Sequence, residues 1–72
     1  MNYRTAEQFD EIIESITNGN WTQGAKECIE YGFWSNDLLN AYDNSNYSED
    51  IETLRDLVLL VEMANKLRSK EV

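Results

Sequence analysis

The chain has 72 residues, no proline and 42% hydrophobic residues, which is enough for one modest hydrophobic core. Its 14 acidic and 6 basic residues give a formal charge of −8, a negative field that disfavours binding to DNA, RNA or anionic membranes. Histidine, the commonest general base and metal ligand, is absent, so we expect no enzyme activity, no cofactor and no metal site.

The first predicted helix begins at Thr5, which is placed to form a capping box with Gln8. Apolar side chains then recur at helical spacing on one face: Phe9, Ile12, Ile13 and Ile16. The opposite face carries the carboxylates Glu7, Asp10, Glu11 and Glu14. The pair Asn18-Gly19 ends the helix, because both residue types accept the left-handed conformation of a helix C-terminus.

A second helix is predicted to begin after Asn20 as its cap, with Gln23 placed to close another capping box. Gly24 weakens this helix by about 1 kcal/mol relative to alanine, which indicates either a close approach of another helix or simple tolerance. Gly32 ends the helix, and Phe33 stands where a Schellman motif makes its hydrophobic contact. Its apolar face consists of Trp21, Ala25, Cys28 and Ile29.

Two further helices follow on the sequence pattern. Ser35 is the predicted cap of a short third helix that runs to about Tyr42, and Ser48 is the predicted cap of a fourth that runs to about Lys70. The fourth is roughly 33 Å long at 1.5 Å per residue, so we expect its C-terminal end to project beyond the core. The predicted fold is therefore all-α: a single four-helix domain over residues 1–72, with three short helices packed on one long C-terminal helix.

The last helix carries two apolar stripes. The broader stripe is predicted to be core, and it comprises Ile51, Leu54, Leu57, Val58, Val61 and Ala64, with Leu60 at its edge. A second stripe on a different side consists of Leu59, Met63 and Leu67. It predicts a homodimer seam or a partner groove, unless the first helix or the region of Trp34 covers it within the same chain.

Carboxylates concentrate in the first helix and at the start of the fourth. If these regions lie together, they form one acidic patch that attracts a basic protein surface, made of Glu7, Asp10, Glu11, Glu14, Asp50 and Asp56. The alternative is a solvated surface that keeps a small protein soluble. Trp34 directly follows Phe33, so the two side chains point in different directions, and Trp34 is either a core residue or an exposed binding anchor.

Several kinds of chemistry are disfavoured by the sequence. Cys28 is the only cysteine and lies among apolar residues, so we expect a buried, inert thiol. Residues 24–41 have the small-residue spacing of a helix-turn-helix, but the second helix has no Lys or Arg for phosphates, which argues against DNA binding. The chain starts directly with a polar amphipathic segment and has no long apolar run, so we expect a cytoplasmic protein.

The segment Asn18-Gly19-Asn20-Trp21-Thr22-Gln23-Gly24-Ala25-Lys26, followed by Tyr31-Gly32-Phe33, resembles small accessory proteins encoded by tailed bacteriophages. The resemblance extends over about a fifth of the chain. Some small acidic phage proteins of this kind inhibit host defence enzymes by occupying their nucleic-acid sites. The resemblance therefore implies a phage-encoded protein that acts in the host cytoplasm, and it implies no functional residues, because this group shares no catalytic motif.

Two functional hypotheses follow from these patterns. The first is a protein-binding inhibitor or adaptor that meets a basic surface on a host protein, in its sharper form as a DNA mimic. Its carboxylates would steer the partner towards it and pair with the partner's Lys and Arg side chains, while Trp34, Leu59 and Met63 would provide the apolar anchor. The second is a self-associating structural or assembly protein that dimerises through Leu59, Met63 and Leu67.

Overall fold

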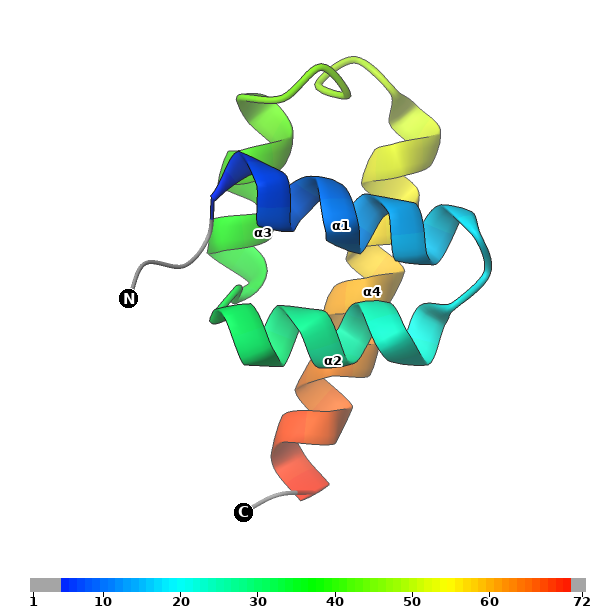
Figure 1. Ribbon diagram of the computed structural model, residues 1–72, viewed down its shortest axis with the longest axis vertical. Coiled ribbons are helices and arrows are strands. Elements are labelled where there is room, and N and C mark those ends of the chain that lie inside the picture. Colours follow the sequence, from blue (N-terminus) through cyan, green and yellow to red (C-terminus); the bar gives the residue numbers. More distant parts are fainter. Residues whose placement is uncertain (1–4, 71–72) are drawn as a thin grey trace.

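The computed structural model describes residues 5–70, which form four α-helices in two layers (Figure 1). Their bounds are α1 Ala6–Thr17, α2 Trp21–Tyr31, α3 Ser35–Asp43 and α4 Ile51–Lys70. Residues 1–4, on which the prediction about location partly rests, and residues 71–72 lie outside the described part. The predicted all-α fold with a long C-terminal helix is confirmed.

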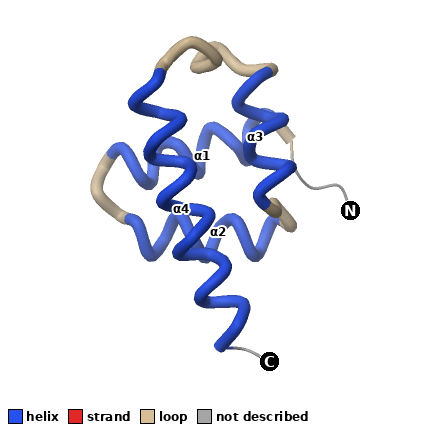
Figure 2. Tube along the Cα trace, turned by 180° about the vertical axis from the view of Figure 1, so that it is seen from behind, coloured by secondary structure: helices blue, strands red, loops and turns tan. Residues whose placement is uncertain are grey.

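The helices form two hairpins that cross each other. Helices α1 and α2 run antiparallel in one layer, and α3 and α4 run antiparallel in the layer behind it, which faces the viewer in Figure 2. Helix α4 packs mainly on α2 and α3, whereas α1 packs on α2 and makes a smaller contact with α3. The last turns of α4 extend past α2, as its length predicts (Figures 1 and 2).

The ends of α1 and the end of α2 follow the sequence closely. The N–H of Gln8 donates to Thr5 Oγ1 and the N–H of Thr5 donates to Gln8 Oε1, both at 3.1 Å, which completes the predicted capping box. Gly19 at φ 83° lies two residues after the end of α1, and Gly32 at φ 79° directly follows the end of α2. After Gly32 the N–H of Phe33 donates to the carbonyl of Cys28 at 2.7 Å, so the predicted Schellman motif is confirmed.

Asn20 is the N-cap residue of α2, as predicted, but its capping box does not form, and the predicted caps of α3 and α4 are wrong. Asn20 makes no side-chain hydrogen bond at the start of α2, and the Gln23 amide instead donates to Glu27 at 3.3 Å. Ser35 is the first residue of α3 and not its cap.

At the starts of α3 and α4 aspartates replace the predicted serines. Asp37 accepts the N–H of Trp34 at 3.0 Å, one residue before α3. Asp50 Oδ1 accepts the N–H groups of Glu52 at 3.1 Å and of Thr53 at 3.4 Å, two residues after the predicted cap Ser48. A carboxylate accepts such bonds more strongly than a hydroxyl and is also favoured by the positive end of the helix dipole.

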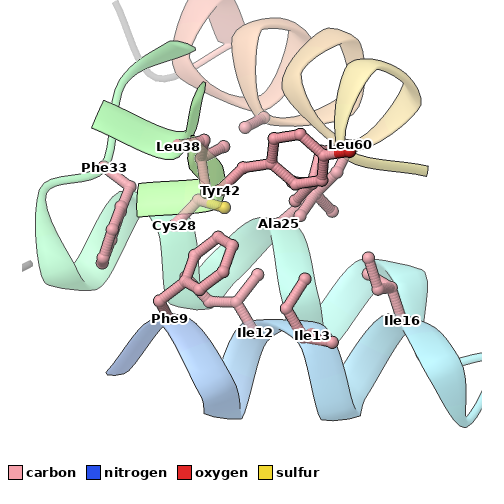
Figure 3. Close-up of a cluster of buried hydrophobic side chains, with 12 residues drawn as sticks. Phe9, Ile12, Ile13, Ile16, Ala25, Cys28, Phe33, Leu38, Tyr42 and Leu60 are labelled. Carbon is pink, nitrogen blue, oxygen red and sulfur yellow. The ribbon is translucent and has the colours of Figure 1, made fainter. Parts of the chain in front are cut away.

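The core lies between the two layers and receives side chains from all four helices (Figure 3). Phe9 lies near one end of it, with its ring centroid 6.4 Å from those of both Phe33 and Tyr47. Each large apolar side chain that is fully buried contributes about 1.5–3 kcal/mol. The buried apolar residues are Phe9, Ile12, Ile13, Ile16, Ala25, Cys28, Phe33, Leu38, Tyr42, Leu57, Leu60 and Ala64.

Gly24 lies where side chains of both α1 and α4 closely approach α2. A Cβ atom at this position would lie 2.9 Å from Cγ2 of Ile16 and 3.3 Å from Cδ1 of Leu60. Both neighbours are buried, so neither moves freely into solvent. The close-approach interpretation of Gly24 is therefore the right one of the two that the sequence left open.

The buried side of α4 differs from the predicted one. Leu57, Leu60 and Ala64 are fully buried, so Leu60 is central and not at the edge. The core prediction is wrong for Ile51 and Val58, which are 72% and 48% exposed. At 100° per residue these two lie roughly 130–150° from the centre of the buried stripe, on a side of α4 that is exposed.

Candidate functional site

The four predicted carboxylates of α1 share an exposed outer face. Glu7, Asp10, Glu11 and Glu14 are all exposed, on the helix that crosses the front of Figure 1. Helix α2 runs alongside and adds the exposed Glu30, and we call these five residues the α1–α2 acidic face.

Tyr31 shows that carboxylates of both helices converge on this face. Its hydroxyl donates to Glu11 Oε1 at 3.0 Å, linking α2 to α1. The pKa of Tyr31 is raised, first by this hydrogen bond, then by burial and by the negative charges of Glu11, Glu27 and Glu30. The phenol therefore lies in a negative field that residues from two helices create together.

The other two predicted carboxylates lie elsewhere. Asp50 caps α4 and belongs to a second acidic cluster in the connection between α3 and α4. There the pKa of Tyr42 is raised by burial and then by the charges of Asp50, Asp43 and Glu49. Asp56 is partly buried on α4, in the layer behind α1.

Glu27 is a structural residue that the sequence interpretation missed. Its spacing from Glu30 is that of a pair on one helix face, but Glu30 is exposed whereas Glu27 is only 9% exposed. The hydroxyl of Ser15 donates to its Oε1 at 2.7 Å, which ties α2 to α1 beneath the acidic face. The available signal was its place next to Gly24 and Cys28 on the buried side of α2.

Trp34 is 58% exposed and held in place by α4. The guanidinium of Arg68 lies 3.9 Å from the centroid of the indole ring, a cation–π contact. The same guanidinium donates to the carbonyl of Phe33, so the C-terminal half of α4 is tied to the junction of α2 and α3. Trp34 therefore presents one ring face to solvent at a defined position.

The second stripe of α4 is only partly available. Leu59 is 48% exposed, whereas Met63 and Leu67 are partly buried and pack against the core. The large apolar side chains that α4 exposes are Ile51, Val58 and Leu59.

A pocket of about 550 Å³, which we call the α1–α3 pocket, opens where the first half of α1 passes α3 and the loop that precedes α4. No sequence pattern predicts this pocket, because its lining comes from separate segments of the chain that only the fold brings together. The lining residues are Thr5, Ala6, Phe9, Asp10, Phe33, Asp37, Asn40, Ala41, Asn44, Ser45, Asn46 and Tyr47.

Cys28 is fully buried in the core, as predicted. Burial raises the pKa of its thiol to about 12, since the nearby charge of Arg68 opposes the shift only in part and that of Glu27 adds to it. At neutral pH the thiol is neutral and shielded, which makes it a poor nucleophile.

Residues 5–70 contain neither a cluster of metal ligands nor a membrane-spanning helix. No three or more Cys, Asp or Glu side chains in this range are arranged to hold a metal ion. No helix in the same range has both the length and the hydropathy needed to cross a membrane.

Comparisons with known proteins leave the family open. No protein-family model matches the chain, and no curated protein or solved structure matches it significantly. The resemblance of residues 18–33 to small phage proteins therefore stays a prediction.

Proposed function

We propose that this domain binds a protein with a basic surface and acts as an inhibitor or adaptor. The observation that carries the proposal is the convergence of carboxylates from α1 and α2 around the hydroxyl of Tyr31. Like charges held this close oppose folding, and cations of a partner relieve that repulsion on binding. The exposed, positioned ring of Trp34 offers an apolar contact of the kind found at binding hot spots.

The sharper form of the proposal is a phage-encoded inhibitor that mimics DNA. The four α1 carboxylates span eight residues, which are seven steps of 1.5 Å or about 10.5 Å of helix axis, so the mean interval between charges is about 3.5 Å. One DNA strand carries a phosphate per about 3.4 Å. The similar linear charge density supports the acidic face as a substitute for a strand of nucleic acid.

The test compares three baits in a bacterial lysate at low and high salt. The first is the natural chain, and the second carries Glu7→Gln, Glu11→Gln and Glu14→Gln. The third is a control with the same change of charge at exposed carboxylates outside the face: Asp43→Asn, Glu49→Gln and Glu62→Gln.

We expect the natural chain and the control to retain the same basic protein, the face variant to lose it, and added salt to weaken retention. For the DNA-mimic form, nucleic acid should compete with the domain for the captured protein. Equal retention by all three baits, indifferent to salt, would falsify the proposal.

The alternative function is self-association through α4, and the exposed Ile51, Val58 and Leu59 favour it. The first turn of α4 carries Glu52 and the last turn carries Arg68 and Lys70, so two copies of the helix have complementary ends when antiparallel. Sedimentation at rising concentration tests this alternative. It predicts a dimer that Leu59→Glu converts to a folded monomer, whereas a natural chain that stays monomeric at high micromolar concentration rules it out.

A further inference from the structure

The α1–α3 pocket has an aromatic base. Phe9 and Phe33 form its floor and Tyr47 stands beside them, with 6.4 Å between the centroids of Phe9 and each of the other two rings. The ring of Tyr47 is the partly exposed one of the three. At about 550 Å³ the pocket falls within the range of small-ligand sites, roughly 300–1,000 Å³.

The rim of the pocket is negative and polar. Asp10 and Asp37 supply carboxylates, and Asn40, Asn44 and Asn46 supply amide groups. Asp37 is fixed in position because it accepts the N–H of Trp34. Among the described lining residues the two charged ones, Asp10 and Asp37, are both acidic, and Asp10 is the exposed one.

An aromatic base beside an acidic and polar rim indicates which kind of ligand the pocket would bind. Phe9 and Phe33 are each only 1% exposed and serve as the apolar floor of the pocket. The partly exposed ring of Tyr47 attracts a cation through its negative face, and carboxylates attract it by charge. A guanidinium group satisfies both, because it is planar, stacks on rings and donates several hydrogen bonds to carboxylate and amide oxygens. Its aliphatic stem suits the apolar lining provided by Ala6 and Ala41.

We propose that the α1–α3 pocket binds a guanidinium group on an aliphatic stem, as presented by an arginine side chain of the basic partner. The arginine part of this inference rests on the proposed function. Asp10 lies both in the lining and on the α1–α2 acidic face, so an arginine in the pocket leaves neighbouring cations of the partner beside Glu7, Glu11 and Glu14.

The test is an NMR titration of the uniformly ¹⁵N-labelled full chain. The probe is N-acetyl-L-arginine amide, and the matched control is N-acetyl-L-citrulline amide, which has nearly the same shape and no charge. We expect the arginine probe to shift the side-chain amides of Asn40, Asn44 and Asn46 and to saturate in the millimolar range. The citrulline probe should bind at least about 5-fold more weakly, since it lacks the charge.

Agmatine and an arginine-containing peptide separate two sources of the guanidinium group. Tighter binding of the peptide than of agmatine identifies a protein side chain, as proposed. Tighter binding of agmatine identifies a free guanidine and overturns the arginine part while supporting the pocket.

Matched variants separate the pocket from the general acidity of the protein. Asp10→Asn should weaken the arginine probe about 2–5-fold, whereas Glu14→Gln, one turn further along α1 and outside the pocket, should leave it unchanged. Asn40→Asp adds a carboxylate to the rim and should tighten binding by a similar factor.

Three results would overturn the inference: equal binding of the arginine and citrulline probes, shifts spread over the acidic surface away from the lining, or equal weakening by Asp10→Asn and Glu14→Gln. The lysate experiment uses Glu7, Glu11 and Glu14, none of which lines the pocket. A negative NMR titration therefore does not affect the lysate experiment, and a negative lysate experiment does not affect the test of the pocket.

Discussion

Replacing Gly24 by alanine has two opposite effects on stability, a gain in helix propensity and a steric clash. The structure indicates which of the two is larger. On helix propensity alone the substitution stabilises α2 by about 1 kcal/mol. The new methyl group, however, would lie 2.9 Å from Ile16 Cγ2 and 3.3 Å from Leu60 Cδ1, where ordinary contacts begin at 3.4 Å. Overpacking of a filled core costs about 1–3 kcal/mol, so we expect Gly24→Ala to lower the free energy of unfolding by about 1 kcal/mol.

Urea denaturation followed by circular dichroism measures this change. For a domain of this size, about 1 kcal/mol corresponds to a fall in Tm of about 4–8 °C. The matched control is Thr22→Ala on the exposed side of the same helix, which gains helix propensity without a clash and should stabilise by a few tenths of a kcal/mol.

A double-mutant cycle identifies the clash as the cause. Ile16→Leu keeps the volume of the side chain but removes the Cγ2 methyl that faces Gly24. In that background Gly24→Ala should destabilise less than in the natural chain, with a coupling of about 0.5–1 kcal/mol. A Gly24→Ala protein that is more stable than the natural chain would refute the close packing of α1, α2 and α4 around Gly24.

Three further predictions concern buried or shielded groups. Ser15→Ala removes the hydroxyl that donates to buried Glu27, and it should lower the free energy of unfolding by about 1–2 kcal/mol in urea denaturation. Cys28 should resist iodoacetamide at pH 8 in the folded protein and react once urea unfolds it. Burial raises the pKa of this thiol from 9.0 to about 12, so the folded chain holds the proton more tightly than the unfolded chain. The contribution of this thiol to the free energy of unfolding should therefore be constant below pH 9 and fall by up to about 4 kcal/mol towards pH 12. Cys28→Ala lacks this contribution, so its stability should fall less steeply over the same pH range. Arg68→Gln removes the cation above Trp34 and should increase acrylamide quenching of the indole in a Trp21→Phe background, whereas a ring that is already fully mobile would show no increase.

The sequence predicts α1 best, because every signal for that helix is local. Thr5 and Gln8 cap each other three residues apart, and Gly19 ends the helix at the position where a positive φ is needed. The apolar spacing from Phe9 to Ile16 leaves one choice of buried side, and that side is the buried one.

For α4 the same reasoning fails, because apolar residues occur on more than one side of the helix. Which side is buried then depends on where α2 and α3 lie, and this information is not in the helix itself. Val58 and Leu60 are both good core residues by type, yet only Leu60 faces the other layer. The start of α4 was also misplaced, since Ser48 and Asp50 are both common caps and only the turn before the helix decides between them.

The candidate site was predictable in its charges and not in its shape. The spacing of Glu7, Glu11 and Glu14 places them on one helix face whatever the fold. The burial of Glu27 depends on Ser15, twelve residues earlier and on another helix. The α1–α3 pocket depends on three segments that are far apart in the chain.

The division of the molecule into two layers explains how so small a domain can keep a stable core beside a concentrated negative charge. The outer carboxylates of α1 project away from the core, and the buried Glu27 is held by donated hydrogen bonds from Ser15 and Gln23, so its charge is stabilised without a cation. At the surface, the hydroxyl of Tyr31 donates a hydrogen bond to Glu11 in the same way. Neutral donors leave the negative charge in place, whereas a pairing lysine or arginine would cancel it. Glu11 and Glu27 therefore keep their contribution to the negative field of the α1–α2 hairpin, and Asp10 brings a carboxylate of the same helix to the lining of the α1–α3 pocket.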